Sequence, residues 1–283
     1  MILRIFLNNE GRLRSGWWIA IFFGVLTAML LPLILAARDA DAGVPIYQQA
    51  GVVIAASVLC QLLRRRPLGE MFGPADLSWP RELFLGALLG ALLMLVPAGF
   101  LYAAGYVTFT FSAASLAAFG PAIGVLVAAG ITEEVLFRGF LFQRLIDGLG
   151  KWPAQVAIAS LFTLTHSDAL KEIGAQGVLA GANIFLASLM FGLAFLRTRS
   201  LAMPLGLHLT ANIVQGPVLG FGVSGDSDPG LLIPLLVPGQ TWVTGGAFGL
   251  EASIPGLVCV LAVIGFLLIW PAPKVTSLRD GRA

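Results

Sequence analysis

The side chains best suited to chemistry in this sequence are two adjacent carboxylates, one arginine and two histidines, all within apolar segments. Glu133, Glu134 and Arg138 share one such segment, and the only two histidines, His166 and His208, occupy two others. Placing a charged side chain at the centre of a bilayer costs about 2.5–3.5 kcal/mol, so such groups are usually paired and functional. The set therefore predicts acid–base chemistry at membrane depth.

Helical spacing predicts which of these groups meet. Residues four apart share one helix face, and three pairs have this spacing: Glu134–Arg138, Phe162–His166 and His208–Asn212. Glu133 points about 100° away from Glu134. One carboxylate can therefore pair with Arg138, while Glu133 is left to take a proton from water.

Each group also has a purely structural interpretation. Glu134 with Arg138 could be a buried ion pair only, which is the favoured interpretation for these two. His166 could be a hydrogen-bonded core residue, and Asn212 an interhelical contact worth about 0.6 kcal/mol. The joint pattern favours a site, because both histidines and the double acid fall in apolar segments.

Composition identifies the class of protein. Apolar residues make up 58% of the 283 residues and charged residues 11%, and the mean hydropathy is +0.90. Soluble domains carry about 25% charged residues, so we expect an all-α polytopic membrane protein with a single domain over residues 1–283. The net charge of +2 argues against a nucleic-acid partner. Membrane lipids are therefore expected partners.

A helix that spans a bilayer needs about 20 mostly apolar residues. Eight segments are predicted to do so: Trp17–Ala37, Ile46–Leu63, Leu83–Val107, Ala113–Leu145, Pro153–His166, Val178–Leu196, Leu201–Gly220 and Ile254–Trp270. Fourteen of the 17 basic residues then fall on one side, which predicts that both termini are cytoplasmic. The Gly- and Pro-rich segment 221–253 is expected to be an outward loop, partly re-entrant around Leu231–Val237.

The same topology predicts the depth of the polar groups. Glu133 and His166 each lie 14 residues from a cytoplasmic end, or about 21 Å at 1.5 Å per residue. His208 is expected to be shallower by about two helical turns. Adjacent helices would bring Glu133, His166, His208 and Asn212 around one intramembrane cavity, which is expected to be more accessible from the cytoplasm.

Three motifs in this order resemble those of the CAAX-processing and bacteriocin-processing (CPBP, or Abi) intramembrane endopeptidases, which are related to the type II CAAX prenyl endopeptidases. The family patterns EExxxR, FxxxH and HxxxN/D correspond to Glu133-Glu134-…-Arg138, Phe162-…-His166 and His208-…-Asn212. The resemblance covers about residues 123–214 by motif. It implies an eight-helix membrane protease that hydrolyses peptide bonds of membrane-associated or lipid-modified substrates.

The resemblance also implies roles for single residues. Glu133 would activate water with help from His166, while His208 and Asn212 would stabilise the oxyanion. Glu134 and Arg138 would brace the site. Zinc held by Glu133, His166 and His208 is an alternative, because two histidines and one glutamate match a catalytic zinc triad. Metal-free catalysis without a cofactor is favoured, since the sequence has no HExxH motif.

Two other functions fit an intact polar cluster. A proton-coupled transporter also places acids and histidines in spans, but its usual internal repeat is not found in this sequence. A non-catalytic immunity or scaffold protein could keep the same residues. The Ala-, Gly- and Leu-rich composition suggests a bacterial cytoplasmic membrane, where prenylated CAAX proteins are not expected. The sequence specifies neither the substrate nor the oligomeric state.

Overall fold

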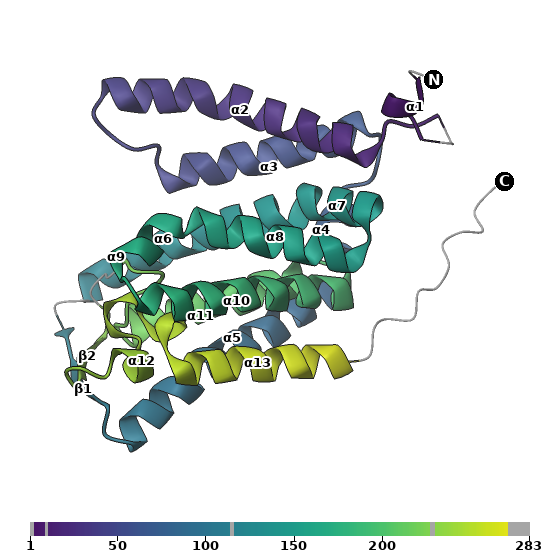
Figure 1. Cartoon of the computed structure of the whole chain (residues 1–283). Coiled ribbons are helices and arrows are strands. Elements are labelled where there is room, and N and C mark those ends of the chain that lie inside the picture. The colour runs from purple at the N-terminus through teal and green to yellow at the C-terminus, as the bar shows by residue number, and fades with distance from the viewer. Residues whose placement is uncertain (1–2, 9–10, 114–115, 227–229, 271–283) are drawn as a thin grey trace.

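The computed structural model describes residues 3–8, 11–113, 116–226 and 230–270. Most of the long helices lie side by side with nearly parallel or antiparallel axes (Figure 1). In chain order the elements are α1 (Leu3–Phe6), α2 (Ser15–Asp39), α3 (Ile46–Leu63), α4 (Gly69–Phe72), α5 (Ser78–Ala103), β1 (Val107–Phe111), α6 (Leu116–Glu134), the π-helical η2 (Val135–Phe140), α7 (Leu141–Leu149), α8 (Lys151–Thr165), α9 (Ser167–Glu172), α10 (Gln176–Thr198), α11 (Ala202–Ile213), the π-helical η3 (Val214–Val218), β2 (Leu232–Leu236), α12 (Thr241–Thr244), the 3₁₀ turns η4 (Gly246–Phe248) and η5 (Leu250–Ala252), and α13 (Ile254–Ile269).

Helices α6, η2, α7 and α8 form the middle of the molecule. The α2–α3 hairpin packs on one side of them, and α5, α10, α11 and α13 lie on the other (Figure 1). Each side has its own apolar cluster: the first includes Phe22, Val53 and Phe140, and the second includes Leu93 and Leu207. The polar residues of α6 therefore lie between two apolar cores.

The predicted spans agree with the helices in position. Each of the eight segments contains a helix, and Ile46–Leu63 has the predicted bounds. Within the described residues, five helices are long and apolar enough to cross a membrane by length and composition: Ser15–Asp39, Ile46–Leu63, Ser78–Ala103, Leu116–Leu149 and Gln176–Thr198. The helices α8, α11 with η3, and α13 are shorter. The chain is thus a mainly helical membrane protein, and the full set of eight spans remains a prediction.

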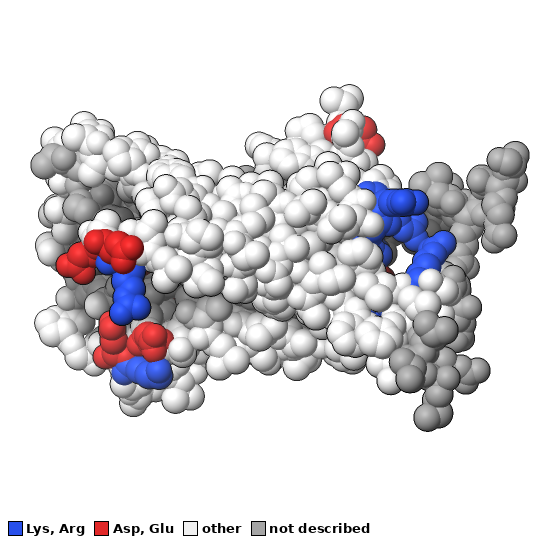
Figure 2. Space-filling view, turned by 90° about the horizontal axis from the view of Figure 1, so that it is seen from above, with Lys and Arg blue, Asp and Glu red and all other residues white. Residues whose placement is uncertain are grey.

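Charged residues are unevenly distributed over the surface. Viewed from above, lysines, arginines and acids gather toward the two ends, and the surface between them carries none (Figure 2). The start of α2 and the end of α13 lie at the same end (Figure 1). A cleft near the start of α2 is lined by Arg12, Arg64 and Arg144, among others. An uncharged belt between charged ends is the surface that a bilayer requires.

The segment 221–253 differs from its prediction. Residues 232–236, expected to be re-entrant, form strand β2, which pairs antiparallel with β1 so that Val107 lies opposite Leu236. The all-α prediction is therefore incomplete, because the structure also contains this two-stranded sheet. Strand β1 has the sequence Val-Thr-Phe-Thr-Phe, and β-branched and aromatic residues favour strands. Its partner lies more than 120 residues away in the sequence, so local pattern could not reveal the pairing.

Three glycines bring α5 and α11 into backbone contact. A Cβ atom at Gly86 or Gly90 would overlap the carbonyl oxygen of Met203 or Leu207, respectively, and one at Gly206 would overlap backbone atoms of α5. In a membrane, where lipid is as apolar as leucine, close packing at small residues is a main source of helix association. Because His208 follows directly after Leu207, this contact fixes the depth of the histidine.

A pair of variants in the same helix tests the role of this contact. Gly90→Ala is expected to destabilise the protein by about 1–3 kcal/mol, because the new methyl group must push α11 away. Gly99→Ala is the matched control, since Gly99 is also in α5 but a Cβ atom there would meet no other atom within 4 Å. Thermal unfolding of both variants in detergent measures the difference. Equal melting temperatures for the two variants would contradict the proposed close contact.

Candidate active site

The double acid lies at a change of helix type. Glu133 and Glu134 are the last residues of α6, and Arg138 lies in the π-helical turn η2 that follows. Gly139 interrupts this turn with φ −74° and ψ −117°. Single π-turns inside α-helices are rare and occur frequently at functional sites. The local sequence thus holds the acids and Arg138 on a distorted segment rather than on a regular helix.

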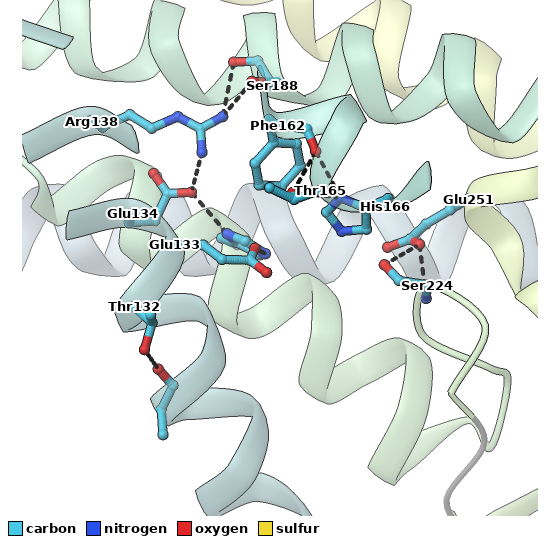
Figure 3. Close-up of polar contacts among 12 residues, drawn as sticks. Thr132, Glu133, Glu134, Arg138, Phe162, Thr165, His166, Ser188, Ser224 and Glu251 are labelled. Atoms are coloured by element: carbon cyan, nitrogen blue, oxygen red, sulfur yellow. Dashed lines mark hydrogen bonds and ion pairs between the residues drawn. The ribbon is translucent and has the colours of Figure 1, made fainter. Parts of the chain in front are cut away.

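Glu134 and Arg138 form a fully buried ion pair. The Arg138 Nη1 donates to Glu134 Oε1 over 3.1 Å, and both side chains are 0% exposed. The second guanidinium nitrogen, Nη2, donates to the carbonyl oxygen and to Oγ of Ser188, at 3.2 and 2.7 Å. Because Ser188 is on α10, this arginine ties η2 to α10 as well as to its own helix (Figure 3). The predicted pairing of Glu134 with Arg138 is confirmed in the structure.

Aromatic rings surround the Arg138 guanidinium. Its Cζ lies 4.9 Å from the ring centre of Phe162, 5.2 Å from that of Phe191 and 5.9 Å from that of Phe137. The electron-rich faces of such rings attract a cation, and the attraction grows when water is excluded. Phe162, which the sequence pattern marks only by its spacing from His166, therefore also contacts the buried ion pair.

His208 lies between the two glutamates. Its Nδ1 is 2.8 Å from Glu134 Oε1, and its Nε2 is 3.5 Å from Glu133 Oε2. Phe191 stacks on the imidazole with ring centres 4.6 Å apart. The ring is thus held on both edges and on one face. His208 was expected to be about two turns shallower than Glu133, and this expectation was wrong, because the depth estimate assumed straight helices with known ends.

A cavity of about 330 Å³ collects the remaining predicted residues. Its lining includes Glu133, His166, His208 and Asn212, as the sequence predicted. The Glu133 side chain is 31% exposed, whereas that of Glu134 is 0% exposed. The two adjacent carboxylates therefore differ in access: Glu133 can contact water and a substrate, and Glu134 can contact only protein.

His166 lies directly after the end of α8, at the junction with α9, and it is also the last residue of the predicted span. Its Nδ1 is 2.8 Å from the carbonyl oxygen of Phe162. A carbonyl can only accept, so Nδ1 carries the hydrogen in this contact. In the neutral ring, Nε2 is then left as an acceptor. His166 and Glu133 share the cavity, but no direct ion pair links them in the described part of the chain.

Glu251 is a further acid at the cavity, and it is not among the residues predicted from the sequence. It lies in η5, and its Oε2 accepts from the backbone nitrogen and Oγ of Ser224, at 3.0 and 2.9 Å. Asn183 of α10 donates to the Glu251 carbonyl oxygen over 2.7 Å. The three side chains all line the cavity, and Figure 3 shows Glu251 beside His166. The only sequence signal for Glu251 was that an acid occurs in a long segment without Lys or Arg.

These contacts close one end of the cavity with the segment 221–253. Ser224, Asp226 and Glu251 belong to the lining, and no Lys or Arg does among the described residues. The segment lies at the end opposite the start of α2 (Figure 1). The cavity thus reaches the end of the molecule opposite the basic end, and the predicted access from the cytoplasm stays a prediction. The sequence could not show how this segment folds back over the helices.

The three residues of the alternative zinc triad are not grouped in the described structure, and zinc binding stays untested. Within the described residues, no three His, Cys, Asp or Glu side chains are grouped closely enough to hold a metal ion. The Nδ1 of His208 is engaged by Glu134 and that of His166 by a backbone carbonyl, so only their Nε2 atoms could bind a metal ion. His208 Nε2 and Glu133 Oε2 already lie 3.5 Å apart, and His166 does not join them.

Comparison with known proteins supports the resemblance drawn from the motifs. Residues 115–214 match a family described as type II CAAX prenyl endopeptidase Rce1-like. This segment contains all six residues predicted for the site, from Glu133 to Asn212. A search of curated proteins found no significant match to the chain.

The buried ion pair can be tested by a double-mutant cycle. Arg138→Met alone is expected to cost about 3–5 kcal/mol, because it leaves Glu134 buried without its partner. Glu134→Gln combined with Arg138→Met is expected to cost less than the sum of the two single changes. Thermal unfolding of the four proteins in detergent gives the coupling. Strictly additive effects would show that the two side chains do not depend on each other.

The Glu251 contacts predict a pH dependence. Burial raises the pKa of the Glu251 carboxyl above its ordinary value of 4.5, and the hydrogen bonds from Ser224 oppose this only in part. Above pH 4.5, the Glu251 carboxyl therefore binds more protons in the folded state than in the unfolded state. The free energy of unfolding then falls as the pH rises through the raised pKa of the folded state. We expect the wild type to gain stability relative to Glu251→Gln as the pH falls from neutral toward 4.5.

Melting temperatures across this pH range provide the measurement. Asp226→Asn is the matched control, because it removes an acid from the same segment and the same cavity. This control is expected to keep the pH dependence of the wild type. A constant difference between wild type and Glu251→Gln at all pH values would contradict the assignment of the titration to Glu251.

Proposed function

We propose that this chain, which matches a Rce1-like endopeptidase family over residues 115–214, is an intramembrane endopeptidase that hydrolyses a peptide bond at this cavity. The observation that carries the proposal is the different environment of the two adjacent acids. Glu134 is buried against Arg138 and His208, and Glu133 faces the cavity beside the same histidine. Hydrolysis needs one group that transfers a proton, for which Glu133 is accessible, and other groups that stay fixed, as the buried Glu134 does.

In the proposed reaction, Glu133 is the general base. Its carboxylate takes a proton from a water molecule in the cavity, and the oxygen of that water attacks the carbonyl carbon of the peptide bond. Glu133 then returns the proton to the leaving nitrogen as the carbon–nitrogen bond breaks. The products are a carboxylic acid and an amine, so the proton and the water are fully accounted for. Glu133 is well suited to this role because it is the acid of the pair that water can reach.

His208 and Asn212 are the proposed oxyanion donors. Glu134 accepts the hydrogen of His208 Nδ1, which leaves Nε2 directed toward Glu133 and the cavity. When Nε2 also carries a hydrogen, the ring is positively charged, and the two carboxylates are balanced by Arg138 and His208. Asn212 is one turn further along the same helix face and also lines the cavity. Fixed donors in a site shielded from water stabilise developing negative charge strongly.

His166 is the proposed assistant of Glu133. With Nδ1 donating to the Phe162 carbonyl oxygen, Nε2 can accept a hydrogen bond from the attacking water and orient it. Glu134, Arg138 and Ser188 hold the histidine of the oxyanion site and do not contact the substrate in this scheme. No metal ion or other cofactor is used, and the peptide lies within the membrane or at its surface, carried by a membrane-associated or lipid-modified protein.

An isosteric change of the general base tests the proposal. Glu133→Gln keeps the size of the side chain but cannot take the proton, so the cleavage rate is expected to fall by about 10²–10⁴-fold. The probe is a fluorogenic farnesylated CAAX peptide, added to protein reconstituted in liposomes. Glu172→Gln is the matched control, because it removes an exposed acid on α9 and is expected to keep the wild-type rate.

Substrate trapping extends the test to native substrates. Membranes that contain Glu133→Gln are expected to accumulate uncut peptides that wild-type protein removes, identified by mass spectrometry. Folded Glu133→Gln protein that cleaves as fast as wild type would refute the role of Glu133. Equal peptide profiles in membranes with wild-type and Glu133→Gln protein would argue for a non-catalytic function instead.

A further inference from the structure

A second polar recess lies at the opposite end of the molecule from the segment that closes the catalytic cavity. It is a cleft of about 940 Å³ near the start of α2. Its lining combines five arginines with a single acid and a few polar and apolar residues: Asn8, Arg12, Leu13, Ser15, Trp18, Leu63, Arg64, Arg65, Arg66, Arg144 and Asp147. Figure 2 shows arginine and lysine side chains around a hollow at one end of the molecule.

Arg144 is the best-defined group of this basic cleft. Its side chain is only 5% exposed, and its Nη1 pairs with Asp147 over 3.0 Å. The Nε of the same guanidinium has no hydrogen-bond partner among the described residues. A buried guanidinium with an unused donor is unfavourable unless an acceptor satisfies it. Arg144 thus lines the cleft with a guanidinium whose hydrogen-bonding capacity is not fully used.

Aromatic rings hold Arg64 and Arg144 next to each other despite their like charge. The Arg64 guanidinium lies 5.8 Å from the ring centre of Trp18 and 5.9 Å from that of Phe140, and Arg144 lies 5.4 Å from the same Phe140 ring. Burial lowers the pKa of Arg64, and the nearby arginines add to this effect while Asp147 opposes it. Asp147 is the only acid in the lining, and Glu70, which lies outside the lining, pairs with Arg66 over 3.5 Å. The arginines of the lining still outnumber these two acids, so the cleft favours an anion.

An apolar groove continues from the cleft along the outside of the protein. The groove has a volume of about 620 Å³, and its lining includes Trp17, Leu145 and Leu149. Ser15 and Arg144 line both recesses, so the cleft and the groove form one continuous site. Helix α1 borders this site: Trp17 Nε1 donates to the Ile5 carbonyl oxygen over 3.0 Å, and Phe6 stacks on Trp17.

We propose that this basic cleft and the apolar groove bind one anionic phospholipid, with its phosphate among Arg64, Arg66 and Arg144 and an acyl chain in the groove. Guanidinium groups bind phosphate oxygens through paired hydrogen bonds. Basic pockets between membrane helices on the cytoplasmic side are a known form of anionic-lipid site. A free phosphate would satisfy the arginines, but only a lipid would also fill the apolar groove.

Native mass spectrometry of the whole chain in detergent tests the proposal. Protein incubated with equal amounts of dioleoyl phosphatidylglycerol and dioleoyl phosphatidylcholine is expected to retain the anionic lipid in preference. Arg66→Gln is the main variant, because Arg66 lines the cleft and its side chain is 44% exposed, so folding should not change. Its affinity for phosphatidylglycerol is expected to fall about 5-fold, and that of Arg64→Gln/Arg144→Gln about 25-fold.

The control variant and a second ligand separate this site from general charge effects. Arg81→Gln removes an exposed arginine outside the lining and is expected to retain the lipid as wild type does. Inorganic phosphate at the same concentration is not expected to displace the lipid, because it makes no contact with the groove. Equal retention of the two lipids, equal loss in Arg81→Gln and Arg66→Gln, or displacement by phosphate would each overturn the proposal. The test measures lipid binding directly, so its outcome does not depend on protease activity.

Discussion

One carboxylate oxygen connects the buried polar groups beside the cavity. Oε1 of Glu134 lies within hydrogen-bond distance of both Arg138 and His208, and Arg138 extends the connection to Ser188 on α10. Three separate segments of the chain are thus joined through groups from which water is excluded. Removing one partner of a buried ion pair lowers the free energy of unfolding far more than an exposed ion pair contributes to it, because the remaining charge stays buried. The position of His208, and with it the geometry available to Glu133, depends on this one acid.

Apolar packing makes that polar connection possible. The glycines of α5 and α11 let the backbones touch, which holds His208 at the level of the two acids. Phe162 and Phe191 cover Arg138, and Phe191 also stacks on His208. Because aromatic faces attract cations, these rings exclude water and still stabilise the charge. A close-packed interior therefore keeps Glu134 inaccessible and leaves only Glu133 open to the cavity.

The sequence predicted what is local, and it could not predict what depends on distant contacts. The positions of the helices follow from apolar runs, and the Glu134–Arg138 pair follows from i,i+4 spacing. Ser188 is 50 residues from Arg138. Glu251 reaches the cavity only because its segment packs against Asn183 of α10 and is held within itself by Ser224. The pairing of β1 with β2 also depends on contacts between residues that are distant in the sequence. The depth of His208 was mispredicted because counting residues from a helix end ignores the π-turn and the packing of neighbouring helices.

The basic cleft and the buried ion pair are built on one continuous segment. Arg138 and Phe140 lie in η2, and Arg144 follows in α7. Phe140 supports the guanidinium groups of Arg64 and Arg144 and stacks on Phe22 of α2 with ring centres 5.4 Å apart. The same turn thus carries the arginine that pairs with Glu134 and the ring that contacts two arginines of the basic cleft. A π-turn has a wider backbone than an α-helix. The six residues of η2 thus hold both Arg138, at the buried ion pair, and Phe140, at the basic cleft.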